Sequence, residues 1–133
     1  MDREILFSDL SKPQDLFLLK DYLREIYRLL DKRHITLDFS ATPTFDMDLA
    51  ESYDMTMTAN VTGVTLKNPS KGRTITLIFI QGGSGSYTIA WTTSVKLAGA
   101  AFVPTVTVGA ASAIKFLYDG TSFYEIGRAL DIR

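Results

Sequence analysis

Residues 74–81 read Thr-Ile-Thr-Leu-Ile-Phe-Ile-Gln, which is the most β-prone run of the chain. Ile75, Leu77 and Phe79 alternate with their neighbours and therefore share one face of an extended chain. Ile78 and Ile80 fall on the opposite face. Because β-branched and aromatic side chains at this density favour extended structure, the run predicts a strand with apolar side chains on both faces.

Further short strands are predicted on both sides of this run, separated by turns. The expected strands are 35–39, 45–49, 53–57, 61–66, 74–81, 87–91, 103–108, 114–118 and 123–126. A glycine-rich loop at 82–86 predicts one hairpin, and Asp119-Gly120 predicts a second hairpin with a type I′ turn. Strands of this number and spacing predict a mainly β fold, an antiparallel β-sandwich or jelly-roll-like domain.

The composition of the chain changes near His34. Residues 1–34 contain no glycine, threonine or valine, whereas residues 35–133 hold all nine glycines. Charged and helix-compatible side chains dominate the first part, and β-branched residues and turn formers dominate the second. The sequence therefore predicts an N-terminal attachment segment with an amphipathic α-helix over residues 1–34, followed by an antiparallel β-domain over residues 35–133.

The helix is predicted to begin near Ser11, which can cap it, and Pro13, which fits the first turn. Apolar side chains then recur at spacings of three and four, the heptad pattern of a coiled-coil seam. The seam residues are Leu16, Leu19, Leu23, Ile26 and Leu30. Two interpretations remain open, a helix packed on its own domain or a short oligomeric bundle. Leucine at the a-type positions with Ile26 at a d-type position favours three or four helices, so we expect a homotrimer.

Four apolar side chains precede the helix, and they are Ile5, Leu6, Phe7 and Leu10. The segment is too short to form its own core, so we expect these side chains to dock against another protein or a neighbouring subunit and so attach the chain. In the alternative interpretation, Phe7 and Leu10 only staple the beginning of the helix against its first turn.

The composition excludes several classes of protein. Of the 133 residues, 46% are hydrophobic and 22% charged, which suits one folded domain. A net charge of −1 gives no reason to expect nucleic acid or an anionic membrane as a partner. We expect no membrane insertion, because no apolar run approaches the ~20 residues that span a bilayer and no signal peptide is recognisable. The absence of cysteine excludes disulfides and thiolate metal sites.

No motif predicts catalysis, a metal site or a cofactor. His34, the only histidine, is expected at the end of the helix as a junction residue. A calcium-binding loop requires a glycine that is missing among the closely spaced acidic residues, which are Asp46, Asp48, Glu51 and Asp54. Gly83-Ser84-Gly85 precedes a predicted strand, whereas a phosphate-binding loop opens a helix. We therefore expect that the protein is not an enzyme.

Aromatic residues are frequent in the second half of the chain, and they are Tyr87, Trp91, Phe102, Tyr118, Phe123 and Tyr124. Such rings fill the core of a β-domain or a subunit interface, and they also stack on sugars. Tyr87 and Trp91, with the loops at 84–86 and 92–94, are the candidate glycan contacts.

The segment from Val61 to Gly127 resembles a C-terminal β-domain that recurs in structural proteins of tailed bacteriophages. The residues that carry the resemblance are Val64–Pro69 before a glycine turn, Thr74–Gln81 before a glycine-rich loop, Thr88–Trp91, Val95–Gly99 before Pro104, and Phe116–Thr121 before Phe123-Tyr124. The chain departs from the family pattern at Gly82 and Gly83, where an aspartate often stands, and at Phe123, where the family often has tryptophan.

The resemblance implies a fibre, spike, baseplate or decoration component of a virion, commonly trimeric and assembled with other virion proteins in the host bacterial cytoplasm. It implies no catalytic residue. The expected function is a trimeric virion structural protein anchored through its N-terminal segment. The alternative is a host-surface glycan-binding module at the tip of a tail appendage.

Overall fold

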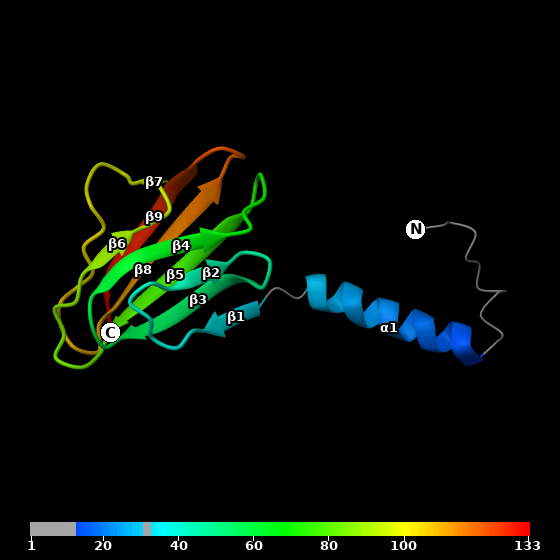
Figure 1. The fold of residues 1–133 in the computed structure, drawn as a ribbon. Coiled ribbons are helices and arrows are strands. Elements are labelled where there is room, and N and C mark those ends of the chain that lie inside the picture. Colours follow the sequence, from blue (N-terminus) through cyan, green and yellow to red (C-terminus); the bar gives the residue numbers. More distant parts are fainter. Residues whose placement is uncertain (1–12, 31–32) are drawn as a thin grey trace. The chain divides into compact units, whose positions relative to one another are not determined.

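The computed structural model describes residues 13–30 and 33–133, and the chain divides into two compact units, Met1–Lys32 and Arg33–Arg133 (Figure 1). The elements in chain order are α1 (Pro13–Leu30), β1 (Arg33–Thr36), β2 (Thr44–Asp46), β3 (Ala50–Met57), β4 (Val61–Lys67), β5 (Thr74–Gln81), β6 (Ile89–Trp91), β7 (Val95–Lys96), β8 (Ala111–Tyr118) and β9 (Phe123–Ile132). The described chain is therefore mainly β with one N-terminal helix, as the sequence predicts. We call Arg33–Arg133 the β-domain.

The helix ends at Leu30, before the predicted junction residue His34. His34 lies within β1, which pairs in parallel with β3. The expectation that His34 lies at the end of the helix is wrong, because its backbone is extended in β1 and its ring bonds to β3. The predicted attachment residues Ile5, Leu6, Phe7 and Leu10 lie outside the described part of the chain, so their role stays a prediction.

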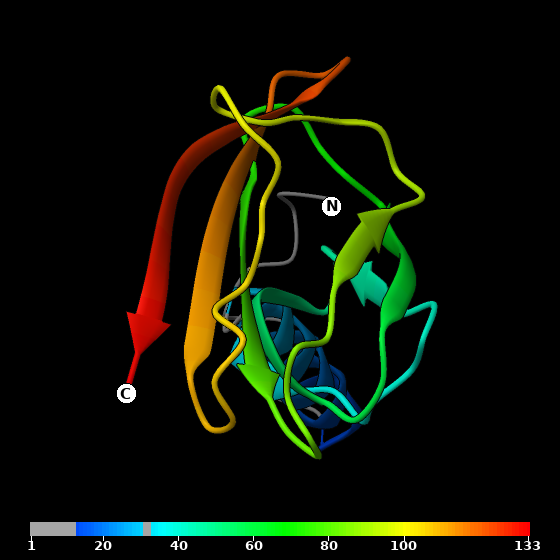
Figure 2. The ribbon, with the colours of Figure 1, turned by 90° about the vertical axis from the view of Figure 1, so that its left-hand side faces the viewer.

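The strands of the β-domain form a six-stranded sheet in the order β1-β3-β5-β8-β9-β7 and a three-stranded sheet in the order β2-β4-β6. From β1 to β6 the chain passes alternately from one sheet to the other, so each sheet gains a parallel strand with every turn of this coil. Figure 2 shows the two sheets facing each other. The β-domain therefore begins as a short solenoid-like coil of parallel strands.

The predicted antiparallel arrangement holds only where β8 pairs with β5 and β9 pairs with β8. The other described pairs are parallel. In particular, the loop at 82–86 forms no hairpin, because the next strand, β6, pairs with β4 in the opposite sheet. Alternation of apolar and polar side chains has the same period in parallel and antiparallel sheets, so it does not reveal strand direction.

The second predicted hairpin is confirmed, since β8 and β9 pair in antiparallel register. Its turn differs from the expected type I′ turn. The Asp119 carboxylate accepts hydrogen bonds from the backbone N–H groups of Thr121 at 2.8 Å and Ser122 at 2.7 Å. The aspartate therefore organises a longer turn through its side chain, as aspartates do in Asx-turns.

The predicted strand at 103–108 is absent from the described chain, which has an irregular segment there. Pro104 is buried and has no N–H group to donate to a sheet. The N–H group of Thr105 donates instead to the Ser112 hydroxyl at 3.0 Å. A side chain, rather than a neighbouring strand, thus holds this segment.

The core lies between the two sheets and takes one face of strands such as β3, β5 and β8, whereas β9 contributes only Phe123. β5 shows the pattern most clearly, because Ile75, Leu77 and Phe79 are fully buried and the residues between them are half-buried. The rings of Phe79 and Phe45 pack edge to face with their centroids 6.0 Å apart, and the rings of Phe45 and Tyr53 do so with their centroids 5.2 Å apart. These edge-to-face contacts join the two sheets, because Phe45 lies on β2 while Tyr53 and Phe79 lie on β3 and β5.

Candidate functional site

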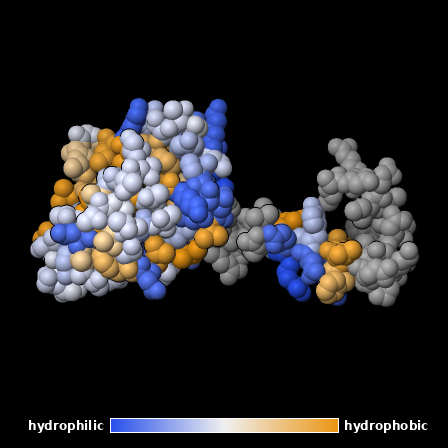
Figure 3. Space-filling view, viewed as in Figure 1, coloured by the Kyte–Doolittle hydropathy of each residue, from blue (hydrophilic) through white to orange (hydrophobic). Residues whose placement is uncertain are grey.

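The helix α1 carries an exposed apolar stripe. Leu16 is 45% exposed, Leu23 44% and the flanking Tyr27 70%, while Leu19 and Ile26 are half-buried. Figure 3 shows apolar and charged residues side by side on this unit. Large apolar side chains gathered at heptad spacing on one face of a helix mark a contact surface.

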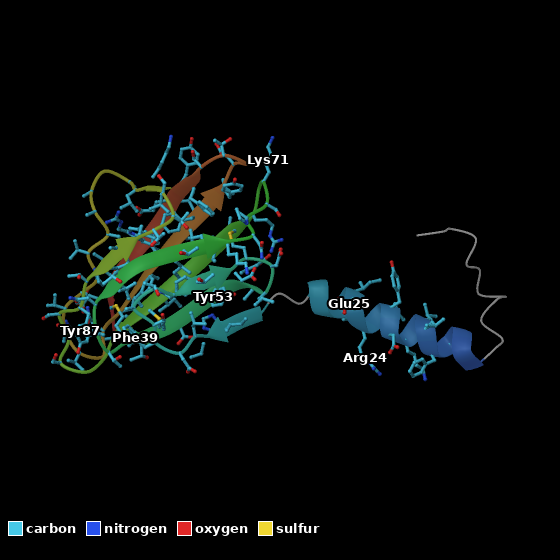
Figure 4. All side chains as sticks on the ribbon, in the orientation of Figure 1. Arg24, Glu25, Phe39, Tyr53, Lys71 and Tyr87 are labelled. Atoms are coloured by element: carbon cyan, nitrogen blue, oxygen red, sulfur yellow. The ribbon has the colours of Figure 1, made fainter. Side chains whose placement is uncertain are left out.

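Charged residues occupy much of the rest of the helix surface, together with two apolar side chains, Phe17 at 64% and Leu18 at 63% exposure. The carboxylate of Asp21 lies 3.6 Å from the guanidinium of Arg24, one turn further along the helix. Figure 4 labels Arg24 and Glu25 on α1. The helix is thus amphipathic as predicted. Of the predicted seam, Leu30 is the last helical residue and its side chain lies outside the described set.

The β-domain has two different ends. The chain enters at the beginning of β1, and β3 and β5 run parallel to β1, so their first residues lie at the same end. Their last residues lead into loops at the opposite end, where β8 begins. Figure 4 shows Lys71, before β5, and Tyr87, after β5, at opposite ends of the domain.

Three loops meet at the end opposite the point where the chain enters. They are 58–60, 82–88 and 103–110, and we call them the loop end. The N–H group of Gly82 donates to the carbonyl of Met57 at 2.9 Å, and that of Ser86 donates to Val106 at 3.0 Å. Thr88 donates its N–H group to the Asn60 carboxamide at 3.0 Å. The loops therefore form one connected surface.

The three loops themselves contain no charged residue, since their sequences are Thr-Ala-Asn, Gly-Gly-Ser-Gly-Ser-Tyr-Thr and Val-Pro-Thr-Val-Thr-Val-Gly-Ala. The C-terminal Asp131 and Arg133 lie at the same end of the domain, because Ile132 pairs with Ala111. Hydroxyl, amide and small apolar groups make up the surface, with Val106 56% and Val108 55% exposed. At the other end, the turns hold charged residues such as Lys71, Arg73 and Asp119. The three loops offer hydrogen bonds and apolar contact to an uncharged partner, while the charged groups at this end belong to the C-terminal Asp131 and Arg133.

Gln81 organises the loop end from within. Its side chain is 1% exposed, and its carboxamide donates to the carbonyl of Tyr87 at 2.9 Å and accepts from the Tyr87 N–H group at 3.1 Å. Its own backbone accepts from Gly109 at 2.7 Å and donates to Ala110 at 3.0 Å. One buried residue therefore fixes both longer loops. Sequence reasoning missed this role, although a glutamine closing an apolar strand is the signal that marks it.

The loop at 82–88 is shaped by its own side chains. Gly83 and Gly85 have φ of 52° and 76°, which favours glycine. A Cβ at Gly83 would lie 2.5 Å from the Tyr87 hydroxyl. That hydroxyl lies 3.2 Å from the Ser84 hydroxyl, and the hydrogen bond with Ser84 lowers the pKa of Tyr87. The loop is thus held in one conformation without a hairpin partner.

The two candidate glycan contacts lie in different surroundings. Tyr87 belongs to the loop end. The Trp91 ring packs edge to face on Phe116, with the ring centroids 5.2 Å apart, and lies tilted against Phe102, with the centroids 6.5 Å apart. Phe102 and Phe116 are core residues. Both side chains are half-buried and pack against the core, Trp91 on β6 and Tyr87 in the loop at 82–88.

A cluster that the sequence did not predict joins β1 to β3. The His34 ring contacts the Ser52 hydroxyl through Nδ1 at 2.9 Å and the Asp54 carboxylate through Nε2 at 2.5 Å. Thr36 donates its hydroxyl to the same Asp54 oxygen at 2.7 Å. These hydrogen bonds, that from Thr36 first, hold the pKa of Asp54 below its ordinary value. The signal in the sequence is alternation, which places His34 with Thr36 and Ser52 with Asp54 on one face of each strand.

Serine, imidazole and carboxylate also occur together in hydrolytic sites, but a reaction needs further groups around them. A nucleophile needs donors aimed at a developing oxyanion and a place for the substrate. Here the cluster lies on the exposed face of the edge strand β1, and its bonds run between the two strands. The arrangement therefore explains how β1 is fastened to the sheet.

The acidic residues that are close in sequence have separate partners. Asp46 accepts from the N–H group of Asp48 at 2.9 Å and from Asn68 at 3.0 Å, which closes the turn after β2. Glu51 lies 3.5 Å from Arg73, and Asp54 belongs to the His34 cluster. Within residues 13–30 and 33–133, no group of three or more metal-ligating side chains comes together.

In the part of the chain that the structure describes, no helix is long and apolar enough to cross a membrane. Comparisons with protein-family models, with curated proteins and with solved structures find no match to this chain.

Proposed function

We propose that this chain is a structural protein of a bacteriophage virion, a trimeric fibre, spike or decoration component. Residues 1–34 attach it and bring its copies together, and the β-domain faces outward. The proposal gives the chain no catalytic role and no cofactor. Its place is the assembled virion, with other virion proteins as partners.

One structural observation supports the proposal independently of the resemblance. The chain enters the β-domain at one end of the parallel strands, and the loop end lies at the other. A component attached through the segment before Arg33 would be joined to the β-domain at the end opposite these loops. The exposed apolar stripe on α1 supports self-association, because stripes of this size are covered in a stable assembly.

Deletion of residues 1–10 tests the attachment. We expect the shortened chain to keep its β-sheet circular dichroism, because the β-domain forms a separate compact unit, and to be missing from purified particles. Particles of the phage that encodes the chain are grown with either full-length or shortened protein, and incorporation is measured by quantitative mass spectrometry.

The matched control replaces charged residues of the same segment, as in Asp2→Asn with Glu4→Gln, and leaves its apolar side chains intact. This variant should enter particles at the level of the full-length chain. Normal occupancy by the deletion variant would show that attachment lies elsewhere. Absence of the full-length chain from particles would overturn the proposed function itself.

A second candidate function is recognition of a host-surface glycan by the loop end. The observation in its favour is the fixed, uncharged loop at 82–88 with Tyr87 on it. A glycan array probed with purified protein tests it, with Ser84→Ala and Tyr87→Ala as loop variants and Lys71→Ala as the control at the opposite end. Binding that Tyr87→Ala abolishes and Lys71→Ala leaves unchanged is the expected result. Binding to no glycan on the array would contradict this function.

A further inference from the structure

We propose that neighbouring copies of the β-domain join edge to edge, with β9 of one copy lying in parallel beside β1 of the next. The paired stretches are 127–129 in β9 and 34–36 in β1. In the proposed function the copies meet only through residues 1–34, so this contact is an additional surface on the β-domain. It rests on the three copies of that proposed function.

The six-stranded sheet has an open edge on each side. β1 is the first strand of the sheet, and β7, the last, pairs only with Phe123 and Tyr124 of the ten residues of β9. From Glu125 onward no described strand pairs with the outer edge of β9, which Figure 2 shows as the outermost strand of the domain. An open edge presents unpaired N–H and C=O groups, to which a strand of another chain can bond.

The exposed side chains of β9 favour a protein partner at this edge. Ile126 is 52% exposed, and Leu130 and Ile132 are each 45% exposed. A hydrophobic edge strand in water promotes association, so such edges are normally charged or covered. The segment 98–101 does not extend the ladder, because Arg128 holds it through side-chain hydrogen bonds to two of its carbonyls, both at 3.0 Å.

The direction of the strands decides which edge can be the partner. β1, β3 and β5 run parallel to one another, β8 reverses this direction and β9 reverses it again. β9 and β1 therefore run the same way, and a rotation about an axis along the strands can bring them together as a parallel pair. A contact between two different edges is heterologous and closes into a ring, as in a trimer, whereas two β9 edges would meet antiparallel in a dimer.

The register of the sheet places the two stretches at matching levels. Residues paired across successive strands share a level, and two such levels connect β1 with β9. The first consists of His34, Ser52, Thr76, Lys115 and Gly127, and the second of Thr36, Asp54, Ile78, Ala113 and Ala129. A closed ring allows no shift along its axis from one copy to the next, and stretches at equal levels satisfy this condition.

Charge is complementary at the next level. Asp38 follows Thr36 by two residues and is exposed. On β9 the next paired residue after Ala129 is Ile132, and the side chain of the adjacent Arg133 is 61% exposed. Parallel pairing would bring the Asp38 carboxylate of one copy near the Arg133 guanidinium of its neighbour, which favours this pairing over others.

Paired cysteine variants test the contact in the full chain, which has no cysteine of its own. Thr36→Cys with Ala129→Cys should form disulfide-linked dimers and trimers on mild oxidation, because adjacent strands place paired Cα atoms about 5 Å apart. Within one copy four strand spacings, about 19 Å, separate the two positions, so a link must join two copies. His34→Cys with Gly127→Cys, at the other level, should link in the same way. The matched control, Thr36→Cys with Lys115→Cys, places the second thiol on β8 and should stay reduced.

The pattern of links distinguishes the alternatives. Cross-linking of Ala129→Cys alone would show that β9 lies beside β9 of its partner and would overturn the proposed pairing. Linked species larger than a trimer would show an open row of copies and would contradict the closed ring. A trimer in which neither cysteine pair links would overturn the edge contact alone.

A charge exchange tests the level at which the edges meet. Asp38→Arg and Arg133→Asp should each weaken association about two- to fivefold per contact, the effect of an exposed ion pair. The double variant should recover the original association, measured by sedimentation equilibrium. A double variant as weak as the single variants would overturn the assigned level.

The outcomes separate this inference from the function on which it rests. A monomeric mass by light scattering at micromolar concentration overturns both the trimer and the edge contact. A trimer that is cross-linked through the two edges but absent from virions leaves the contact intact and removes the proposed function.

Discussion

Replacing Gln81 by leucine tests whether one buried carboxamide holds the loop end together. Leucine has a similar volume and suits the buried site, since Gln81 is 1% exposed. The variant removes two hydrogen bonds, of 2.9 Å to the carbonyl and 3.1 Å from the N–H group of Tyr87. Both groups of Tyr87 are partly buried and lose their partner, whereas the variant gains only a small apolar contact.

The expected loss follows from those two orphaned groups. A buried polar group left without its partner costs about 1–3 kcal/mol, and we take the lower half of that range because the groups are partly buried. The free energy of unfolding should therefore fall by about 2–4 kcal/mol. For a domain of this size, such a loss lowers the melting temperature by about 10–30 °C.

Urea unfolding followed by fluorescence provides the measurement, because Trp91 is the single tryptophan and packs on Phe102 and Phe116. Protein concentration is kept constant, since association adds to the stability of an oligomer. Ser84→Ala is the control, because it removes only bonds at an exposed part of the same loop. A loss for Gln81→Leu no larger than that for Ser84→Ala would refute the role given to the carboxamide.

Asp54→Asn should lower the free energy of unfolding near neutral pH and have little effect well below the ordinary pKa of 3.8, because hydrogen bonds from Thr36 and His34 lower the pKa of Asp54 in the folded chain. A lowered folded pKa stabilises the fold above the unfolded pKa, and that stabilisation disappears as the pH falls through the folded value. Urea unfolding of the Asp54→Asn variant and the original chain, near neutral pH and well below the ordinary pKa, measures this pH dependence. An equal loss of unfolding free energy at both pH values would contradict the prediction. Gly83→Ala should cost more than about 1–2 kcal/mol, since its φ of 52° is unfavourable for alanine and its Cβ would displace the Tyr87 hydroxyl. Gly99→Ala, with a φ of 81° and no atom within 4 Å, carries only the backbone cost, so equal losses for the two variants would rule out the contact with Tyr87.

The sequence by itself determined the local structure of this protein. Spacings of three and four defined α1, and alternation of apolar side chains defined strands such as β3, β5 and β8 together with their buried faces. The β8–β9 hairpin was also predictable, because a short turn leaves two consecutive strands only one partner within reach. Each of these features depends on residues close together in the chain.

Only the tertiary structure decided which strands pair and in which direction. Tyr53 lies beside Leu77 in a parallel pair, and Val64 lies beside Trp91 in another, although many residues separate the partners. The contact of His34 with Asp54 and the meeting of the three loops depend on the same coil. The physical reason is that period-two alternation specifies a face but neither a neighbour nor a direction. Gln81 bonds to Tyr87 in the loop after β5, and the next strand, β6, pairs with β4 in the second sheet, which distinguishes the solenoid-like coil from the predicted antiparallel sandwich.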